Sequence, residues 1–290
     1  GDLSSVITDS GNTGSGKSFV GLSGRNLTED SGGGISVNNA NTLLGGTTGR
    51  VTATINQGNF TTLNGLTDAS GPAAGNGLAL TISTTSVDAG DLATLDAKVD
   101  QSNGGSISLS NVTTLTGSFA EHQTFATSGS GNGRHSSFSS KGNIATFSLN
   151  SAEAIGDAGA LNTLHDDLRG INSNAVIDLT NITSISGSYS ELDSILDKET
   201  ATTITGLVTE NLTVDTGQIT VDNANTLNAT TTGVVTASIS TTSVGGLTGL
   251  NANSGESSNQ YTIVVTDTSA DAGDLNTING INGAASIDLT

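Results

Sequence analysis

A long internal repeat is the feature that most restricts how this chain can fold. Residues 206–227, GLVTENLTVDTGQITVDNANTL, repeat most of residues 21–43, GLSGRNLTEDSGGGISVNNANTL, and residues 265–278 match residues 82–95 in the same way. The two copies lie about 184 residues apart. Such a chain is built from similar small units, and a small unit buries its apolar side chains only by stacking on its neighbours.

Short segments that alternate apolar and polar residues recur along the chain and predict β-strands. They lie at 35–37, 51–55, 78–83, 106–110, 144–149, 175–180, 212–214, 219–221, 234–239, 261–265 and 286–290. Many are followed by a Leu-bearing word such as NANTL, DAGDLATL, DAGALNTL or DAGDLNTI. The leading Asp or Asn predicts an N-cap that opens a single helical turn, and residues 190–198 predict a short helix.

We therefore predict an all-β fold, a parallel β-solenoid of stacked irregular coils with short helical turns at its corners. The chain has no Trp, six Phe and two Tyr, which suits a thin core between facing sheets. Tandem β-sandwich modules are the alternative, disfavoured by the absence of Trp, the single Pro and the uneven strand spacing. The corner residues expected in the core are Leu43, Leu95, Leu115, Leu164, Leu227 and Ile278.

The repeat also predicts how the chain is divided. We expect a loop-rich opening segment at 1–20, a first long repeat at 21–205, and the start of a second at 206–290 that stops inside a unit. Since the chain has no methionine, we expect a processed chain or a part of something longer. Further repeats of the same long chain, or copies of this one, are the expected end-to-end partners.

Charge and hydropathy exclude two classes of partner. The formal net charge is −19, from 27 acidic and 8 basic residues, and this repels nucleic acid and anionic membrane surfaces. No run of about 18 apolar residues occurs, so we predict no membrane span.

One segment matches the phosphate-binding P-loop pattern, with Gly11, Gly16, Lys17 and Ser18 at the defining positions. That chemistry needs a buried strand before the loop and a helix after it, and neither flank has the required pattern. The second copy of the repeat has no glycine at the corresponding positions, 196–203. We interpret the match as accidental and keep a nucleotide-binding protein as a remote alternative.

Calcium is the metal that the sequence favours. Asp88 with Asp91, and Asp271 with Asp274, place carboxylates in oxygen-rich corners that suit a hard cation, although helix capping explains these aspartates equally well. His122, His135 and His165 lack metal-ligand spacing and are expected at the surface or in corners. No nucleophile motif and no cluster of acids with bases is present, so we predict that the chain is not an enzyme.

The corner words, namely DAGDLNTI, TTLTGS at 113–118 and TTGVVTAS at 231–238, resemble the tandem repeats of giant secreted bacterial cell-surface proteins, marine cyanobacterial ones especially. The resemblance implies an extracellular or cell-surface location and a structural, adhesive or motility-related role. We therefore expect a segment of a surface filament, surface layer or long adhesin. The alternative is a calcium-dependent adhesin whose insertion at 128–143 reaches a glycan.

Overall fold

The structure is a computed structural model, and it describes residues 23–29, 32–67, 76–100, 103–127, 138–255, 258–283 and 285–290. The chain divides into two compact units, Gly1–Thr146 and Phe147–Thr290. Each is described by itself. The predicted P-loop residues and the expected opening segment at 1–20 lie outside the described residues, as does His135.

The first unit alternates strands with helices. Its elements are β1 (Leu27–Thr28), α2 (Val37–Gly46), β2 (Val51–Thr54), α3 (Phe60–Leu63), β3 (Gly77–Thr81), β4 (Ser86–Asp88), α4 (Ala89–Asp96), β5 (Ser106–Ser108), β6 (Thr114–Gly117), α5 (Phe119–Thr127), β7 (Phe138–Ser139) and the 3-10 helix η2 (Lys141–Asn143). Five strands form one parallel sheet in the order β1-β2-β3-β5-β7, and β4 pairs in parallel with β6. Strand β8 (Thr146–Leu149) begins at the boundary between the units.

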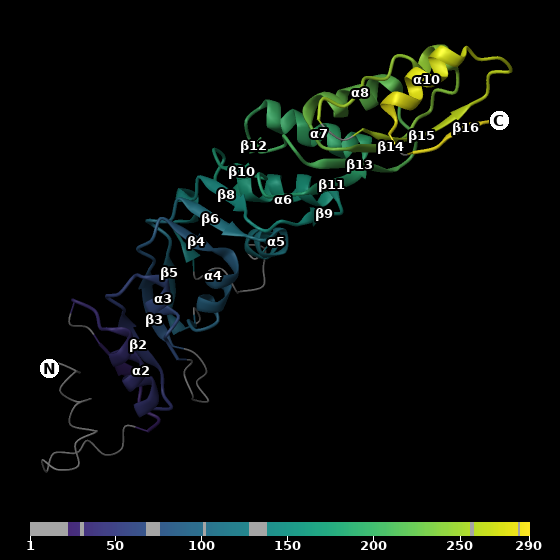
Figure 1. Cartoon of the computed structure of the whole chain (residues 1–290). Helices are drawn as coiled ribbons and strands as arrows, with labels where there is room; N and C mark the ends of the chain where they lie inside the picture. The colour runs from purple at the N-terminus through teal and green to yellow at the C-terminus, as the bar shows by residue number, and fades with distance from the viewer. Residues whose placement is uncertain are drawn as a thin grey trace, which may run out of the picture. The chain divides into compact units, whose positions relative to one another are not determined.

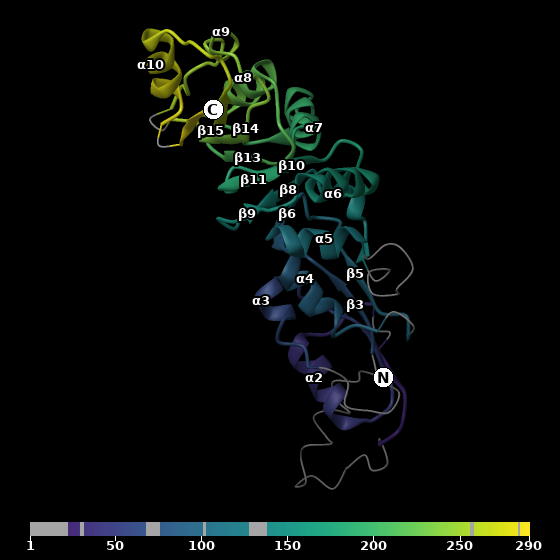
Figure 2. The ribbon, with the colours of Figure 1, turned by 90° about the vertical axis from the view of Figure 1, so that its right-hand side faces the viewer.

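The second unit follows the same plan. Its elements are β9 (Ala154–Ile155), α6 (Ala158–Ile171), β10 (Val176–Asp178), β11 (Ser184–Ser188), α7 (Tyr189–Thr200), β12 (Ile204–Thr205), β13 (Asn211–Thr216), α8 (Val221–Thr230), β14 (Val235–Ser238), α9 (Val244–Leu247), β15 (Gln260–Val265), α10 (Ala272–Ile281) and β16 (Ile287–Leu289). A parallel sheet runs β16-β15-β14-β13-β11-β9, and β10 pairs in parallel with β12. Consecutive helices lie side by side, α6 next to α7 and α7 next to α8 (Figures 1 and 2).

The predicted all-β solenoid is wrong, because the fold is mixed α/β with parallel sheets and helices between the strands. The β-sandwich alternative fails as well, since the strands of the sheets pair in parallel. The corners expected to hold single helical turns extend into full helices. In α6, for example, Ala158, Leu161, Leu164, His165 and Leu168 recur at helical spacing and all are buried.

Two predicted strands begin helices instead. The words at 35–37 and 219–221 each contribute one isolated bridge residue, Ile35 or Ile219, before the chain turns into α2 or α8. The hydroxyl of Ser36 accepts from Asn39 N, and that of Thr220 accepts from Asn223 N, so each caps the helix that follows.

The core is made of aliphatic rows, as the sequence predicts. All six corner residues expected inside are buried, namely Leu43, Leu95, Leu115, Leu164, Leu227 and Ile278. The predicted helix at 190–198 is confirmed as part of α7, whose buried face carries Leu192, Ile195 and Leu196.

Candidate functional site

The sites that carry the chain's polar chemistry lie where one helix meets the next. In the first unit this place is the N-terminus of α4. Asp88 Oδ1 accepts from Gly90 N at 3.0 Å and from Asp91 N at 3.3 Å, so the predicted cation ligand caps the helix. Its other oxygen, Oδ2, accepts from the hydroxyl of Thr116 on β6 at 3.4 Å.

Glu121 of α5 reaches the same point from the neighbouring helix. Its Oε2 accepts from the backbone N of Ser118 at 2.7 Å and from the Ser118 hydroxyl at 2.9 Å. These two hydrogen bonds lower the pKa of Glu121. Its Oε1 lies against Gly90, where a side-chain Cβ would stand only 2.3 Å away. The carboxylate thus fills a space that only glycine leaves open.

The environment at the start of α4 also changes the pKa of Asp91. Burial raises its pKa, and the charges of Asp88 and Glu121 raise it further. Three acidic groups therefore gather at the start of α4. Among the residues that the structure describes, however, no three Asp, Glu, His or Cys side chains are arranged to hold a metal ion.

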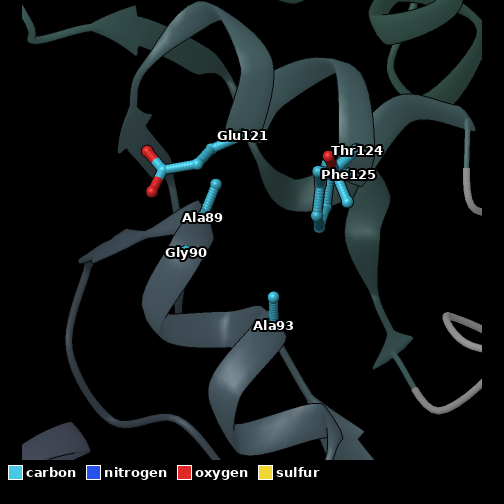
Figure 3. Close-up of a pocket in the computed structure, with 6 residues that line it drawn as sticks. All are labelled: Ala89, Gly90, Ala93, Glu121, Thr124 and Phe125. Atoms are coloured by element: carbon cyan, nitrogen blue, oxygen red, sulfur yellow. The ribbon is translucent and has the colours of Figure 1, made fainter.

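A hollow of about 170 Å³ lies between α4 and α5. Figure 3 shows the Glu121 carboxylate above Ala89 and Gly90, with Phe125 and Thr124 across from Ala93. The hollow exists because Ala93 has a small side chain. At the equivalent position of α6, in the second unit, the residue is Asn162. Asn162 Nδ2 donates to Glu191 O on α7 at 2.9 Å, and its Oδ1 accepts from the Ser194 hydroxyl at 3.2 Å.

A second, more polar hollow of about 240 Å³ lies on the other side of Asp88. It is lined by Asn59, Phe60, Thr61, Thr84, Ser86, Val87, Asp88, Asp91 and Thr116. The buried hydroxyl oxygen of Thr84 has no hydrogen-bond partner among the described residues. This is the most oxygen-rich place at which the structure puts two of the predicted calcium ligands together.

The other predicted pair, Asp271 and Asp274, starts α10. Asp271 Oδ1 accepts from Gly273 N at 2.7 Å and from Asp274 N at 3.3 Å, the same capping arrangement as in α4. Both residues are exposed. The structure thus keeps the two predicted pairs in separate units, each as the cap and first turn of a helix.

Of the two alternatives expected for the histidines, surface or corner, His122 and His165 follow the second, since they lie in α5 and α6 and are buried there. His122 is fully buried, and its Nδ1 and Nε2 lie 2.9 Å from Ser118 O and 3.2 Å from Leu115 O. His165 is buried where α6 meets β12, because its position continues the apolar face of α6. Helical spacing is the signal that would have placed it there.

His165 joins a polar chain that sequence reasoning missed. Its Nδ1 lies 2.8 Å from Asp166 Oδ1 and its Nε2 lies 3.0 Å from the Thr203 hydroxyl. The order hydroxyl, imidazole, carboxylate is that of a nucleophile with its base. However, Thr203 Oγ1 donates its one proton to Lys198 O at 3.1 Å, so the hydroxyl is not activated by His165. Burial lowers the pKa of His165.

Recurring asparagines connect one strand-and-helix segment, called a coil from here on, to the next. Asn41 Nδ2 donates to Gly65 O at 2.7 Å, and Asn225 Nδ2 donates to Gly249 O at 2.8 Å. Each amide oxygen in turn accepts a backbone N–H from the following coil, that of Thr67 at 2.9 Å or Asn251 at 2.8 Å. With Asn162, the Asn of the Asn-Thr-Leu word is thus a connector between neighbouring helical corners.

Comparison with known proteins identifies no relative, because no family model, curated protein or solved structure matches the chain. In the part of the chain that the structure describes, no helix has the length and apolar character needed to cross a membrane.

Proposed function

We propose that the chain is a structural repeat segment of an extracellular filament, surface layer or long adhesin, with a mechanical and not a catalytic role. The observation that carries this proposal is the repeated connection between coils. Three asparagines use both the nitrogen and the oxygen of the side-chain amide in hydrogen bonds to the neighbouring coil, namely Asn41, Asn162 and Asn225. Polar groups that would serve a ligand elsewhere are here used to stack one coil on the next.

The surface charge supports the same role. A net charge of −19 keeps a long array of such coils apart from its neighbours in solution. The resemblance of the corner words to repeats of secreted bacterial surface proteins supports the extracellular location.

Single-molecule pulling tests the mechanical role. We expect the chain to unfold in several steps, each releasing one or a few coils, because each coil is stabilised mainly by its neighbours. Asn225→Ala should lower the force of the step that includes α8 and α9. Asn251→Ala serves as the control for loss of an amide, because Asn251 is exposed and its backbone N–H, which bonds to Asn225, is kept. Unfolding of the whole chain in one step would contradict the proposal.

Location is tested separately with an antibody raised against the purified chain. Electron microscopy of intact source cells should show the label outside the cell, on fibres or a surface layer. Label confined to the cell interior would exclude the extracellular role.

A calcium-dependent adhesin is the second candidate, and one observation favours it. The polar hollow beside Asp88 combines two carboxylates with the unpartnered Thr84 hydroxyl. Of the insertion at 128–143 that would reach a glycan, only residues 138–143 are described. In this case excess calcium raises the melting temperature, since a ligand that binds only the folded state stabilises it, and Asp91→Asn abolishes the rise. Asp274→Asn measures the contribution of the second pair. An unchanged melting temperature in calcium would remove this candidate.

A further inference from the structure

Two pairs of helices in this chain dock by the same contact. In the first pair, Glu121 of α5 lies against Gly90 of α4, and in the second, Glu191 of α7 lies against Gly159 of α6. A Cβ on Gly90 would stand 2.3 Å from Glu121 Oε1, and one on Gly159 would stand 2.7 Å from Glu191 Oε1. The glycine therefore leaves the space that the carboxylate occupies, and a Cβ there would displace the carboxylate.

The segment that brings in the glutamate is the same in both pairs. It reads Gly-Ser-x-x-Glu, where Ser188 and Glu191 form the capping box that opens α7. Ser118 and Glu121 make the corresponding hydrogen bonds at the start of α5. The glycine of the word also packs closely, since a Cβ on Gly187 would stand 2.7 Å from Ala158 Cβ.

In each pair, the helix that begins with Asp-Ala-Gly receives the glutamate of the next helix. Helix α10 begins with the same three residues. Residues 268–273 read TSADAG, against TSVDAG at 85–90 before α4. Around Gly273, however, the only atom of the described residues within 4 Å of an added Cβ is Asp271 Oδ1 of its own cap, at 2.9 Å. Both glutamates of the Gly-Ser-x-x-Glu type are already engaged, Glu121 with Gly90 and Glu191 with Gly159.

Apolar side chains around Gly273 are uncovered at positions that α4 and α6 bury. Ala272 is exposed, whereas Ala89 and Ala158 are buried at the same position. In the strand that follows, Leu289 of β16 is 62 % exposed, whereas its counterparts Leu109 and Leu179 are completely buried. Helix and strand together therefore leave one face of this coil open.

The backbone before α10 also has no strand partner among the residues that the structure describes. Residues 86–88 form β4 by pairing with β6, which leads directly into the Gly-Ser-x-x-Glu word. The matching residues 269–271 form no strand. The same local sequence is thus a strand where its partner is present and irregular where it is not.

We propose that the open face formed by residues 268–275 and 287–290 is a docking site for a polypeptide coil that carries an Asn-x-Thr turn, a short strand and a Gly-Ser-x-x-Glu helix start. The inference rests on the proposed structural function and names the partner of the stacking surface. Continuity with the α4–α5 and α6–α7 interfaces identifies the occupant, because an Asp-Ala-Gly helix start preceded by a short strand receives such a segment twice in this chain.

The chain itself supplies the probe. Residues 286–290, SIDLT, align with residues 176–180, VIDLT, so a copy of residues 181–205 can be joined directly after Thr290 in register. We expect hydrogen–deuterium exchange in residues 266–275 and in the appended segment to slow by about tenfold or more when the segment docks. A scrambled segment of the same composition should leave exchange in residues 266–275 unchanged.

A cycle of variants separates this contact from general stabilisation. Gly273→Ala in the extended chain should restore fast exchange in residues 266–275, and its effect on the parent chain is subtracted. Gly280→Ala in the same helix is the matched control, because an added Cβ there comes within 4 Å of no other atom in the described part of the chain. Fast exchange in the appended segment, or protection that survives Gly273→Ala, would overturn the proposal.

Other occupants give different results. Self-association of the unextended chain that Gly273→Ala abolishes would mean that a second copy covers the face, and would overturn the occupant named here. The readout is independent of the pulling and location experiments, so a chain that unfolds coil by coil but does not dock the segment refutes the inference alone.

Discussion

Exchanging Ala93 and Asn162 between the two units tests whether the Asn connector stabilises the stacking of helices. Asn162 makes three hydrogen bonds across the α6–α7 interface, to Glu191 O, to the Ser194 hydroxyl and to the ammonium group of Lys198. Each is worth about 1 kcal/mol net, and alanine regains about 0.6 kcal/mol of helix propensity. Asn162→Ala should therefore destabilise the second unit by about 2 kcal/mol.

The reverse change should stabilise the first unit. Ala93 borders the hollow of about 170 Å³, where Glu121 O and the Thr124 hydroxyl occupy the places of Glu191 O and Ser194. The Thr124 hydroxyl already donates its one proton to Ala120 O at 2.9 Å, so only the hydrogen bond from the introduced amide to Glu121 O is new. One hydrogen bond of about 1 kcal/mol, less about 0.6 kcal/mol of helix propensity, predicts that Ala93→Asn stabilises the unit by about 0.5 kcal/mol. For a unit of this size that raises the melting temperature by about 1–2 °C.

The assay is urea unfolding followed by hydrogen exchange in α5 and α7, so that each unit is read separately. Ala120→Asn, at an exposed position of α5, measures the propensity cost alone. If Ala93→Asn destabilises the first unit as much as Ala120→Asn does, or if Asn162→Ala has no effect, the connector role is refuted.

Three further changes have definite expected results. Leu164→Asp buries a charge in α6 and should unfold the neighbouring coils while distant ones remain, and an unaltered circular-dichroism melt would count against the stacked core. The buried hydroxyl of Tyr261 has no partner among the described residues, so Tyr261→Phe should leave thermal stability unchanged or raise it by up to about 1 kcal/mol, and a clear loss in the melt would show a missed hydrogen bond. Burial, with the charge of Glu199 adding to it, raises the pKa of Glu210, so the folded state holds this proton more tightly than the unfolded state. Stability should then fall as pH rises from about 4 through the folded-state pKa, Glu210→Gln should remove this dependence, and denaturant melts across that pH range with the same slope in both proteins would contradict the assignment.

Sequence patterns located most strands and the helix caps, for reasons that are local. Alternation with a period of two identifies β3 and β14 without tertiary information. For Asp88 and Asp271 the sequence left capping and calcium binding open, and the capping half of that prediction rests on local geometry, because an Asp before Ala-Gly-x-Leu has backbone N–H groups within its own reach. The burial of the corner leucines follows from the same words.

The lengths of the helices were not predictable in the same way. Helices α2 and α8 are rich in Asn and Thr, and α2 also contains two Gly; these residues have low helix propensity, so the words around NANTL indicated only a turn. Thr42 and Thr226 donate to the carbonyl four residues earlier, which satisfies their hydroxyls without adding to the stability of the helix. Most of the stabilisation comes from the neighbouring coil, which no local window contains.

The helix starts at 85–90 and 268–273 also show that local sequence does not determine local structure. The words TSVDAG and TSADAG differ only in Val87 and Ala270, yet one forms a strand with a filled glycine slot and the other does not. Alanine has a lower strand propensity than valine, but that difference is within about 1 kcal/mol and does not determine pairing. The presence of β6 and Glu121 does, since they supply the hydrogen-bonded partner and the carboxylate. In a chain of stacked coils, the structure of a segment therefore depends on which coil follows it, and exchange measurements on residues 268–273 report that dependence directly.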